Sequence, residues 1–133
     1  MAKVIFTEGA LAKTLADSGW GNLTACLSTK PCSGAGAHVV GDTYAGGFGN
    51  ITGTGYTPQA ATEPAANSSG TKVWPTVSFS TGTATDWPAA VKSVVYYDAS
   101  NKLVYAEDLS ATRDMSAAYR TITHTLTTTS AVS

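Results

Sequence analysis

Residues 86–109 read DWPAAVKSVVYYDASNKLVYAEDL, and their alternation of apolar and polar positions predicts a β-hairpin. If Asp98 pairs with Lys102, the turn consists of three residues, and Asn101 takes the left-handed conformation that such a turn requires. The opposite charges of Asp98 and Lys102 then face each other across the two strands. Turn chemistry and strand pattern therefore agree on a hairpin.

This turn also sets the register of the two arms. It places Tyr96 opposite Val104 and Val94 opposite Ala106. In the first arm one face is predicted to carry Val91, Ser93, Val95 and Tyr97. In the second arm one face is predicted to carry Leu103, Tyr105, Glu107 and Leu109.

Three further segments are predicted strands: NLTACLS (22–28), KVWPTVSFS (72–80) and YRTITHTLTTTS (119–130). Alternation in the second segment predicts one face formed by Val73, Val77 and Phe79, opposite Trp74, Thr76 and Ser78. Pro75 has no N–H to donate, so it is expected at a sheet edge or a bulge.

The last strand is predicted to have one apolar face and one polar face. Ile122, His124 and Leu126 share the first face. The second face is a row of β-branched polar residues: Thr121, Thr123, Thr125 and Thr127.

One segment near the N-terminus predicts a short helix. Thr7 is suited to cap it, Leu11 and Leu15 mark one face, and Ser18-Gly19 supplies the stop. A short strand is also expected around Tyr56, in GYTPQAATEPAANSSGT (55–71). With about six or seven short strands in all, the chain is predicted to be mainly β, an antiparallel β-sandwich of jelly-roll or immunoglobulin-like type. A single domain, 1–133, is expected, with 1–19 as an N-terminal arm and short helix.

Charge and hydropathy exclude several classes of protein. Charged residues make up 13% of the chain and the net charge is -1, against about 25% charged residues in typical soluble domains. No basic surface for nucleic acid is predicted, and no stretch approaches the roughly 18 apolar residues of a membrane helix. No signal peptide is visible, so synthesis in a cytoplasm is expected.

No cofactor or metal is predicted. Cys26 and Cys32 have no recognised metal-ligand spacing, and free thiols are expected in a reducing compartment. The glycine-rich stretch DTYAGGFGN (42–50) lacks the residue order of a phosphate-binding loop, and Asp42 alone is far from a calcium-ligand set.

Candidate catalytic groups are few. Asp86 and Asp108 lie beyond opposite arms of the hairpin and are a candidate carboxylate pair for glycoside hydrolysis, and His124 is a candidate general base. A capping Asp86 and a packed His124 are favoured instead, because no motif places a nucleophile. Glu107 and Asp114 are the remaining acidic candidates, and the competing interpretation of Glu107 and Asp108 is that they are surface charges.

Aromatic side chains offer a binding alternative, since they dominate interfaces and stack on ligands. The candidates are Trp20, Tyr44, Phe48, Tyr56, Trp74 and Trp87. Packing in the core or in loops is the competing interpretation for each.

The order of motifs resembles that of small structural proteins of tailed bacteriophages, a group of head-decoration, head-fibre and tail-fibre-like proteins. The segments that carry this resemblance are GALAKTLADSGW (9–20), GTGYTPQ (53–59), VSFSTGTATDWPAAVKSVVYYDASNKLVYAEDL (77–109) and YRTITHTL (119–126). The chain departs from the group in its Cys26–Cys32 segment and in SATRDMSA (110–117), so head or tail location stays open.

The resemblance implies a non-enzymatic virion component, most simply a capsid-decoration protein whose partner is the major capsid protein. The low surface charge predicts that copies of the chain associate with one another, most simply as trimers. The attachment segment is predicted at the apolar start of the chain, which has no obvious pairing partner. Its residues are Val4, Ile5, Phe6, Leu11 and Leu15. The alternative is a tail-fibre or tail-tip module that binds host-surface glycan through exposed loop aromatics, namely Tyr44, Phe48 and Tyr56.

Overall fold

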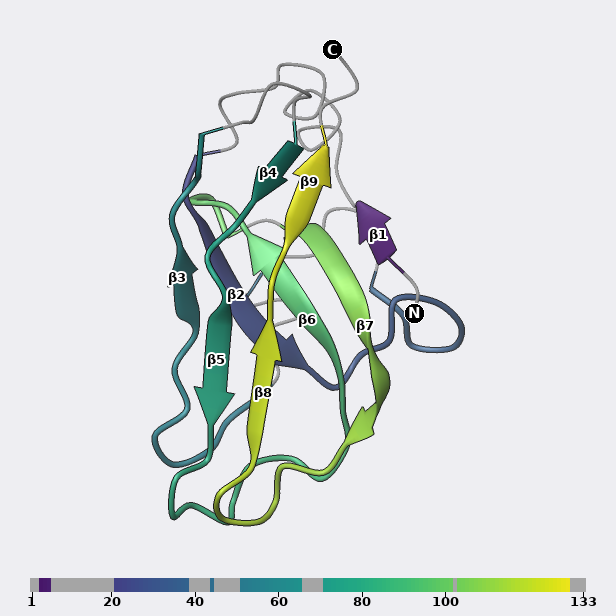
Figure 1. Ribbon diagram of the computed structural model, residues 1–133. Coiled ribbons are helices and arrows are strands. Elements are labelled where there is room, and N and C mark those ends of the chain that lie inside the picture. Colours follow the sequence, from purple (N-terminus) through teal and green to yellow (C-terminus); the bar gives the residue numbers. More distant parts are fainter. Residues whose placement is uncertain are drawn as a thin grey trace.

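The computed structural model describes residues 3–5, 21–38, 44, 51–65, 71–101 and 103–129, which are mainly β (Figure 1). All strand pairs among these residues are antiparallel, as predicted. The described strands are β1 (Lys3–Ile5), β2 (Leu23–Ser28), β3 (Gln59–Ala61), β4 (Thr71–Val73), β5 (Val77–Ser80), β6 (Val91–Tyr97), β7 (Leu103–Arg113), β8 (Thr121–His124) and β9 (Thr127–Thr129). The helix predicted after Thr7 lies outside the described residues.

Five strands form the main sheet, in the order β1-β7-β6-β2-β3. Two smaller ladders, β4-β9 and β5-β8, lie over one face of this sheet (Figure 1). Since β4 leads into β5 and β8 into β9, the two ladders form one interrupted ribbon. The Trp74 N–H donates to the Leu126 carbonyl oxygen (2.8 Å) at the interruption.

The main core lies between the ribbon and the five-stranded sheet. The ribbon contributes Trp74, Val77, Phe79, Ile122 and Leu126, and the sheet contributes Leu23, Leu27, Val91, Val94, Tyr96 and Val104. Their side chains are almost wholly removed from water. Burial of each large apolar side chain contributes about 1.5–3 kcal/mol, which makes this core the main source of stability.

The β6–β7 hairpin forms with the predicted turn but not with the predicted register. Asn101 has φ 61° and its N–H donates to the Asp98 carbonyl oxygen (2.9 Å), which confirms its left-handed position. Lys102 lies outside the described residues, and so does the predicted ion pair between Asp98 and Lys102. Tyr97 pairs with Leu103, but the next pair is Tyr96 with Tyr105.

Val104 is therefore an extra residue, a β-bulge, and the predicted pairs Tyr96–Val104 and Val94–Ala106 are wrong. Val94 instead pairs with Glu107. Because side chains alternate along a strand, one inserted residue moves every later side chain to the opposite face. Tyr105 accordingly faces the main core, while Leu103 joins a second cluster on the other face of the sheet.

Pro75 lies where the ribbon is interrupted, as its missing N–H led us to expect. The interruption also changes the phase of the alternation. Trp74 is buried in the core, whereas Val73 is 60% exposed. The prediction that Val73 shares a face with Val77 and Phe79 is therefore wrong, since residues 74–76 do not continue the strand.

The last strands follow the predicted pattern. Ile122 and Leu126 are buried and His124 is half-buried. The threonine row Thr121, Thr123, Thr125 and Thr127 is exposed. The outer face of the ribbon is therefore mostly polar and uncharged at these positions, with Val73 as an exposed apolar residue opposite Thr127.

The N-terminal segment has a pairing partner, contrary to our expectation. Strand β1 pairs with β7 and forms one edge of the main sheet, with Val4 opposite Ala106 and Ile5 opposite Tyr105. The sequence distance between the two strands hides this pairing. The other predicted attachment residues, Phe6, Leu11 and Leu15, lie outside the described residues.

Candidate functional site

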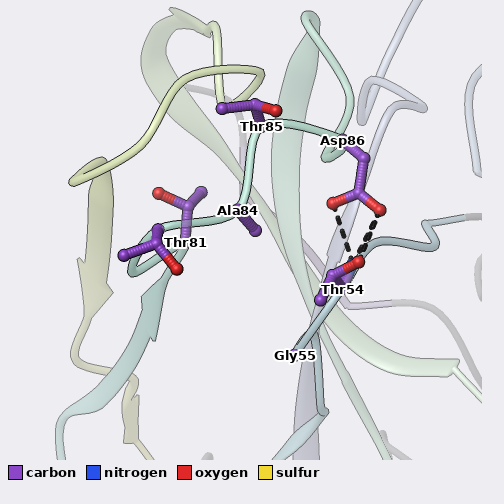
Figure 2. Close-up of a pocket in the computed structure, with 7 residues that line it drawn as sticks. Thr54, Gly55, Thr81, Ala84, Thr85 and Asp86 are labelled. Atoms are coloured by element: carbon purple, nitrogen blue, oxygen red, sulfur yellow. Dashed lines mark hydrogen bonds between the residues drawn. The ribbon is translucent and has the colours of Figure 1, made fainter.

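Residues of two loops, 54–55 and 81–86, line a pocket, and residues 114–120 form a third loop fastened to the second one. We call this region, formed by residues 53–56, 81–86 and 114–120, the loop end. The pocket has a volume of about 540 Å³, and Figure 2 shows residues that line it. The lining residues are Thr54, Gly55, Thr81, Thr83, Ala84, Thr85 and Asp86. Hydroxyl groups and one carboxylate therefore dominate its chemistry.

A tight turn supports one wall of the pocket. The Tyr56 N–H donates to the Gly53 carbonyl oxygen (3.1 Å), and Gly55 has φ +75°, the value that a type II turn demands at its third position. The Trp87 indole N–H donates to the Thr54 carbonyl oxygen (2.8 Å). A Cβ on Gly53 would lie 2.4 Å from Trp87 Cδ1, so only glycine fits there.

The Asp86 carboxylate is held against this turn. It accepts the Thr54 N–H at both oxygens (2.9 and 3.1 Å) and the Thr54 hydroxyl at Oδ2 (2.7 Å) (Figure 2). These hydrogen bonds hold the pKa of Asp86 below its ordinary value. The pocket therefore carries a fixed negative charge at neutral pH.

The second wall is fastened to residues 117–120. The Thr81 N–H donates to the Arg120 carbonyl oxygen (2.9 Å), and the Arg120 N–H donates to Thr81 Oγ1 (3.0 Å). The Thr81 hydroxyl donates to the Ala117 carbonyl oxygen (2.9 Å). Both walls are thus formed before any ligand arrives, as is usual for small-molecule sites.

Tyr119 stands beside this wall in an unusual conformation. Its φ is 61° and its exposed fraction is 80%, while its N–H donates to the Gly82 carbonyl oxygen (2.7 Å). Bulky residues rarely adopt a positive φ. Sequence analysis missed Tyr119, because SAAYR contains none of the glycine, asparagine or aspartate residues that usually announce a left-handed residue.

The aromatic candidates are mostly packed inside the molecule. The Tyr56 ring contacts Trp87 edge-on (centroids 5.1 Å apart) and stacks on Phe79 (6.1 Å), and its hydroxyl accepts the Leu27 N–H (2.9 Å). Tyr56 is therefore a half-buried core residue rather than an exposed loop aromatic.

The remaining aromatic candidates either pack against other side chains or lie outside the described residues. The Tyr44 ring packs on Tyr97 (5.1 Å) and is also half-buried. Trp74 and Trp87 are core residues. Phe48 and Trp20 lie outside the described residues.

The candidate carboxylate pair is not assembled. Asp86 bonds to Thr54 in the pocket, whereas Asp108 accepts the Cys32 N–H (2.9 Å) and is not a lining residue. Asp114 accepts the Ser116 N–H (2.9 Å) within its own turn. Each of these three carboxylates therefore has a structural partner. Glu107, predicted as a surface charge, is instead buried, with 6% of its surface exposed.

His124 joins the two layers of the molecule. Its Nδ1 lies 2.8 Å from the Tyr96 hydroxyl, and its Nε2 lies 3.0 Å from Glu107 Oε1. A neutral imidazole satisfies both contacts if Tyr96 donates to Nδ1 and Nε2–H donates to Glu107. Burial raises the pKa of Tyr96 and keeps its hydroxyl protonated. These two contacts give His124 a structural role between the layers.

The other face of the main sheet carries a smaller buried cluster. It consists of Cys26, Cys32, Val95, Tyr97, Leu103 and Ala106, with Tyr44 packed against it. Ser93 donates to the Lys30 carbonyl oxygen (2.7 Å) and lies 3.0 Å from His38 Nε2. These contacts fasten residues 30–38 to the sheet. Both cysteines are free thiols, as predicted.

The two thiols are expected to react slowly with a disulfide reagent such as DTNB in the folded protein at about pH 8. Burial raises the pKa of Cys26 to about 12. Burial, followed by the hydrogen bond with Asp108, raises the pKa of Cys32 to about 12. Both groups therefore stay protonated, and the reaction should accelerate only as the pH approaches that value. Labelling in urea is the control. Rapid labelling of either cysteine in the folded protein would contradict this prediction.

Within the part of the chain that the structure describes, no three His, Cys, Asp or Glu side chains gather closely enough to hold a metal ion. Nor does any helix in that part have the length and apolar character needed to cross a membrane. Comparison of the chain with protein-family models, curated proteins and solved structures finds no match. The interpretation of the loop end therefore rests on its own geometry.

Proposed function

We propose that the chain is a non-enzymatic structural protein of a bacteriophage virion, which decorates the capsid by binding the head surface and stabilising the shell. In this proposal the two layers of strands form a β-sandwich of jelly-roll or immunoglobulin-like type. The major capsid protein is the partner, and copies of the chain associate, most simply as trimers.

The observation that best supports this proposal is the edge of the main sheet at β1 and β7. Strand β1 covers only residues 105–107 of the eleven-residue β7, and Ser110, Ala111, Thr112 and Arg113 are exposed. An edge strand presents N–H and C=O groups that a strand from another chain can pair with. This edge therefore suits attachment to a neighbouring subunit through backbone pairing.

The surface chemistry is compatible with such a role. The outer face of the ribbon carries exposed threonines, and the whole chain has a net charge of -1. A surface with few charges loses little hydration energy when it is covered by another protein. Many copies on one shell then give strong total binding from a modest single interface.

Deletion of residues 2–8 is expected to reduce occupancy on purified virus particles by about tenfold or more, because it removes β1, the outermost strand of the edge that is proposed to attach. Occupancy is measured by quantitative gel analysis, and immunogold labelling or cryo-EM locates the protein on head or tail. A thermal unfolding scan of the purified variant separates lost attachment from lost folding. Normal occupancy of the deletion variant, or density on the tail alone, would contradict the proposal.

A glycan-binding tail module built on Tyr44, Phe48 and Tyr56 has less support. Tyr44 packs on Tyr97 and Tyr56 packs on Trp87, so both rings already have partners inside the molecule. Tight binding to a glycan array that is lost in Tyr44→Ala, in a variant that still folds, would favour this alternative over capsid decoration.

A further inference from the structure

We propose that the pocket at the loop end binds a neutral carbohydrate, with Asp86 as a hydrogen-bond acceptor and Tyr119 as an aromatic contact beside it. This function is separate from capsid attachment through the β1–β7 edge. It also uses none of the aromatic residues that sequence analysis singled out.

The charge of the pocket selects the ligand class. Among its described lining residues there is one carboxylate, Asp86, and there is no lysine, arginine or histidine. Phosphates, sulfates and acidic sugars would meet a fixed negative charge with no cationic partner, which disfavours them. A cation would find a single carboxylate, far from the six to eight oxygen ligands of calcium.

The hydroxyl groups of the pocket match a polyhydroxylated ligand. Thr54, Thr81, Thr83 and Thr85 line it, and a threonine hydroxyl both donates and accepts hydrogen bonds, as a sugar hydroxyl does. The volume of about 540 Å³ is within the range of small-molecule sites. An apolar ligand would leave these hydroxyls without partners, so a sugar fits the lining better.

Asp86 is positioned to accept from such a ligand. The carboxylate accepts the N–H and the hydroxyl of Thr54. The side chain is exposed, so a ligand hydroxyl can approach the carboxylate from the solvent side. The lowered pKa of Asp86 keeps it ionised there, and a hydrogen bond to an ionised acceptor is stronger than one to a neutral acceptor.

Tyr119 is the second and independent sign of a site. Two non-glycine residues among those described have a positive φ. Asn101 is explained by its hairpin turn, since asparagine tolerates this conformation. The hairpin turn that explains Asn101 does not apply to Tyr119. Tyr119 is 80% exposed, so packing does not explain its positive φ either.

Strained residues that persist in a fold are concentrated at binding sites, where the surrounding structure holds them in place. Here the Tyr119 N–H is held by Gly82, which lies between the lining residues Thr81 and Thr83. A tyrosine ring offers a flat apolar face with a polar tip, which suits the C–H face and the hydroxyls of a sugar ring. The backbone of Tyr119 is thus fastened to the loop that lines the pocket.

The test uses the purified full-length chain on an array of neutral oligosaccharides ending in glucose, galactose, mannose or N-acetylglucosamine, together with sialylated and sulfated counterparts. The strongest neutral glycan is then titrated by calorimetry. Neutral glycans are expected to bind, and their acidic counterparts to bind more weakly. Failure of every neutral glycan to bind, or preference for the acidic ones, overturns the proposal.

Two variants locate the site. Asp86→Asn replaces one acceptor oxygen by a donor and is expected to weaken binding about tenfold or more, whereas Asp98→Asn, at the opposite end of β6, is expected to have no effect. Tyr119→Gly is expected to weaken binding comparably without lowering the thermal unfolding midpoint, because glycine adopts a positive φ without strain. Asn101→Gly is the control for Tyr119→Gly, and it is expected to retain both the thermal unfolding midpoint and glycan binding.

Unchanged binding in both Asp86→Asn and Tyr119→Gly would overturn the proposal. So would a lower unfolding midpoint in Tyr119→Gly, since Tyr119 would then serve stability. Particle occupancy of Asp86→Asn is measured in parallel and is expected to be normal. Loss of glycan binding with normal occupancy separates this site from capsid attachment.

Discussion

Replacing His124 with alanine is expected to lower the free energy of unfolding by about 2–3 kcal/mol, because it removes two hydrogen bonds, one of them to the Glu107 carboxylate, that are largely shielded from water. His124 contacts Tyr96 on one side and Glu107 on the other, and the side chains of His124 and Glu107 are only 11% and 8% exposed. Its loss leaves a buried carboxylate and a buried hydroxyl without this partner. Urea unfolding, followed by tryptophan fluorescence, measures the effect.

Two further variants show whether the loss comes from the hydrogen bonds. Tyr96→Phe removes one hydroxyl and is expected to cost about 1 kcal/mol. Thr123→Val, on the exposed face of the same strand, keeps the β-branched shape and is expected to change stability by less than about 0.5 kcal/mol. A loss below about 1 kcal/mol for His124→Ala would show that water replaces the imidazole without penalty.

Gly53→Ala is expected to destabilise the protein by about 2–3 kcal/mol, because the new methyl group overlaps the Trp87 ring. Its Cβ would lie 2.4 Å from Trp87 Cδ1 and 2.9 Å from Cγ. The Trp87 ring is held in place, since its N–H is bonded to the Thr54 carbonyl oxygen and the ring packs against Tyr56 in a T-shaped arrangement. Unfolding in urea gives the free energy, and a change in tryptophan emission of the folded state reports the displaced ring.

The matched control is Gly55→Ala in the same turn. No atom lies within 4 Å of a Cβ on Gly55, but its φ of +75° strains any other residue. This variant is expected to cost about 1–2 kcal/mol through backbone strain alone and to leave the emission of Trp87 unchanged. Equal losses with no change in emission in either variant would contradict the steric explanation for Gly53.

Several features of the fold were predictable because they depend on neighbouring residues. The hairpin turn follows from Asp98 and Asn101, whose side chain and backbone preferences act within the turn itself. The interruption at Pro75 follows from its missing N–H. The exposed threonine row of β8 follows from strict alternation. None of these requires knowledge of a distant partner.

The incorrect predictions of strand register and burial have a different cause. The bulge at Val104 reverses the faces of β7, yet nothing in the local pattern marks it, because either register leaves apolar residues on both faces. Similarly, Trp74 reaches the core only because the strand stops beside it. The sequence pattern is ambiguous wherever both faces of a strand are buried, and cross-strand packing then chooses the register.

The candidate site was less predictable than the fold. Asp86 was recognised as a turn-capping residue, but its partner Thr54 is 32 positions away. Tyr119 was not recognised at all, because its conformation is imposed by Gly82 and not by its own neighbours. The aromatic residues that stood out in the sequence proved to be mostly packing residues.

The sequence by itself determined the local structure of this protein: antiparallel strands, a hairpin closed by Asn101, and a polar threonine face, all set by preferences that operate over a few residues. Tertiary structure alone decided the register of β7, the pairing of β1 at the sheet edge, and the pocket that joins Thr54 to Asp86. The physical reason is that these features depend on contacts between distant segments, whose free energies appear only when the two layers pack together.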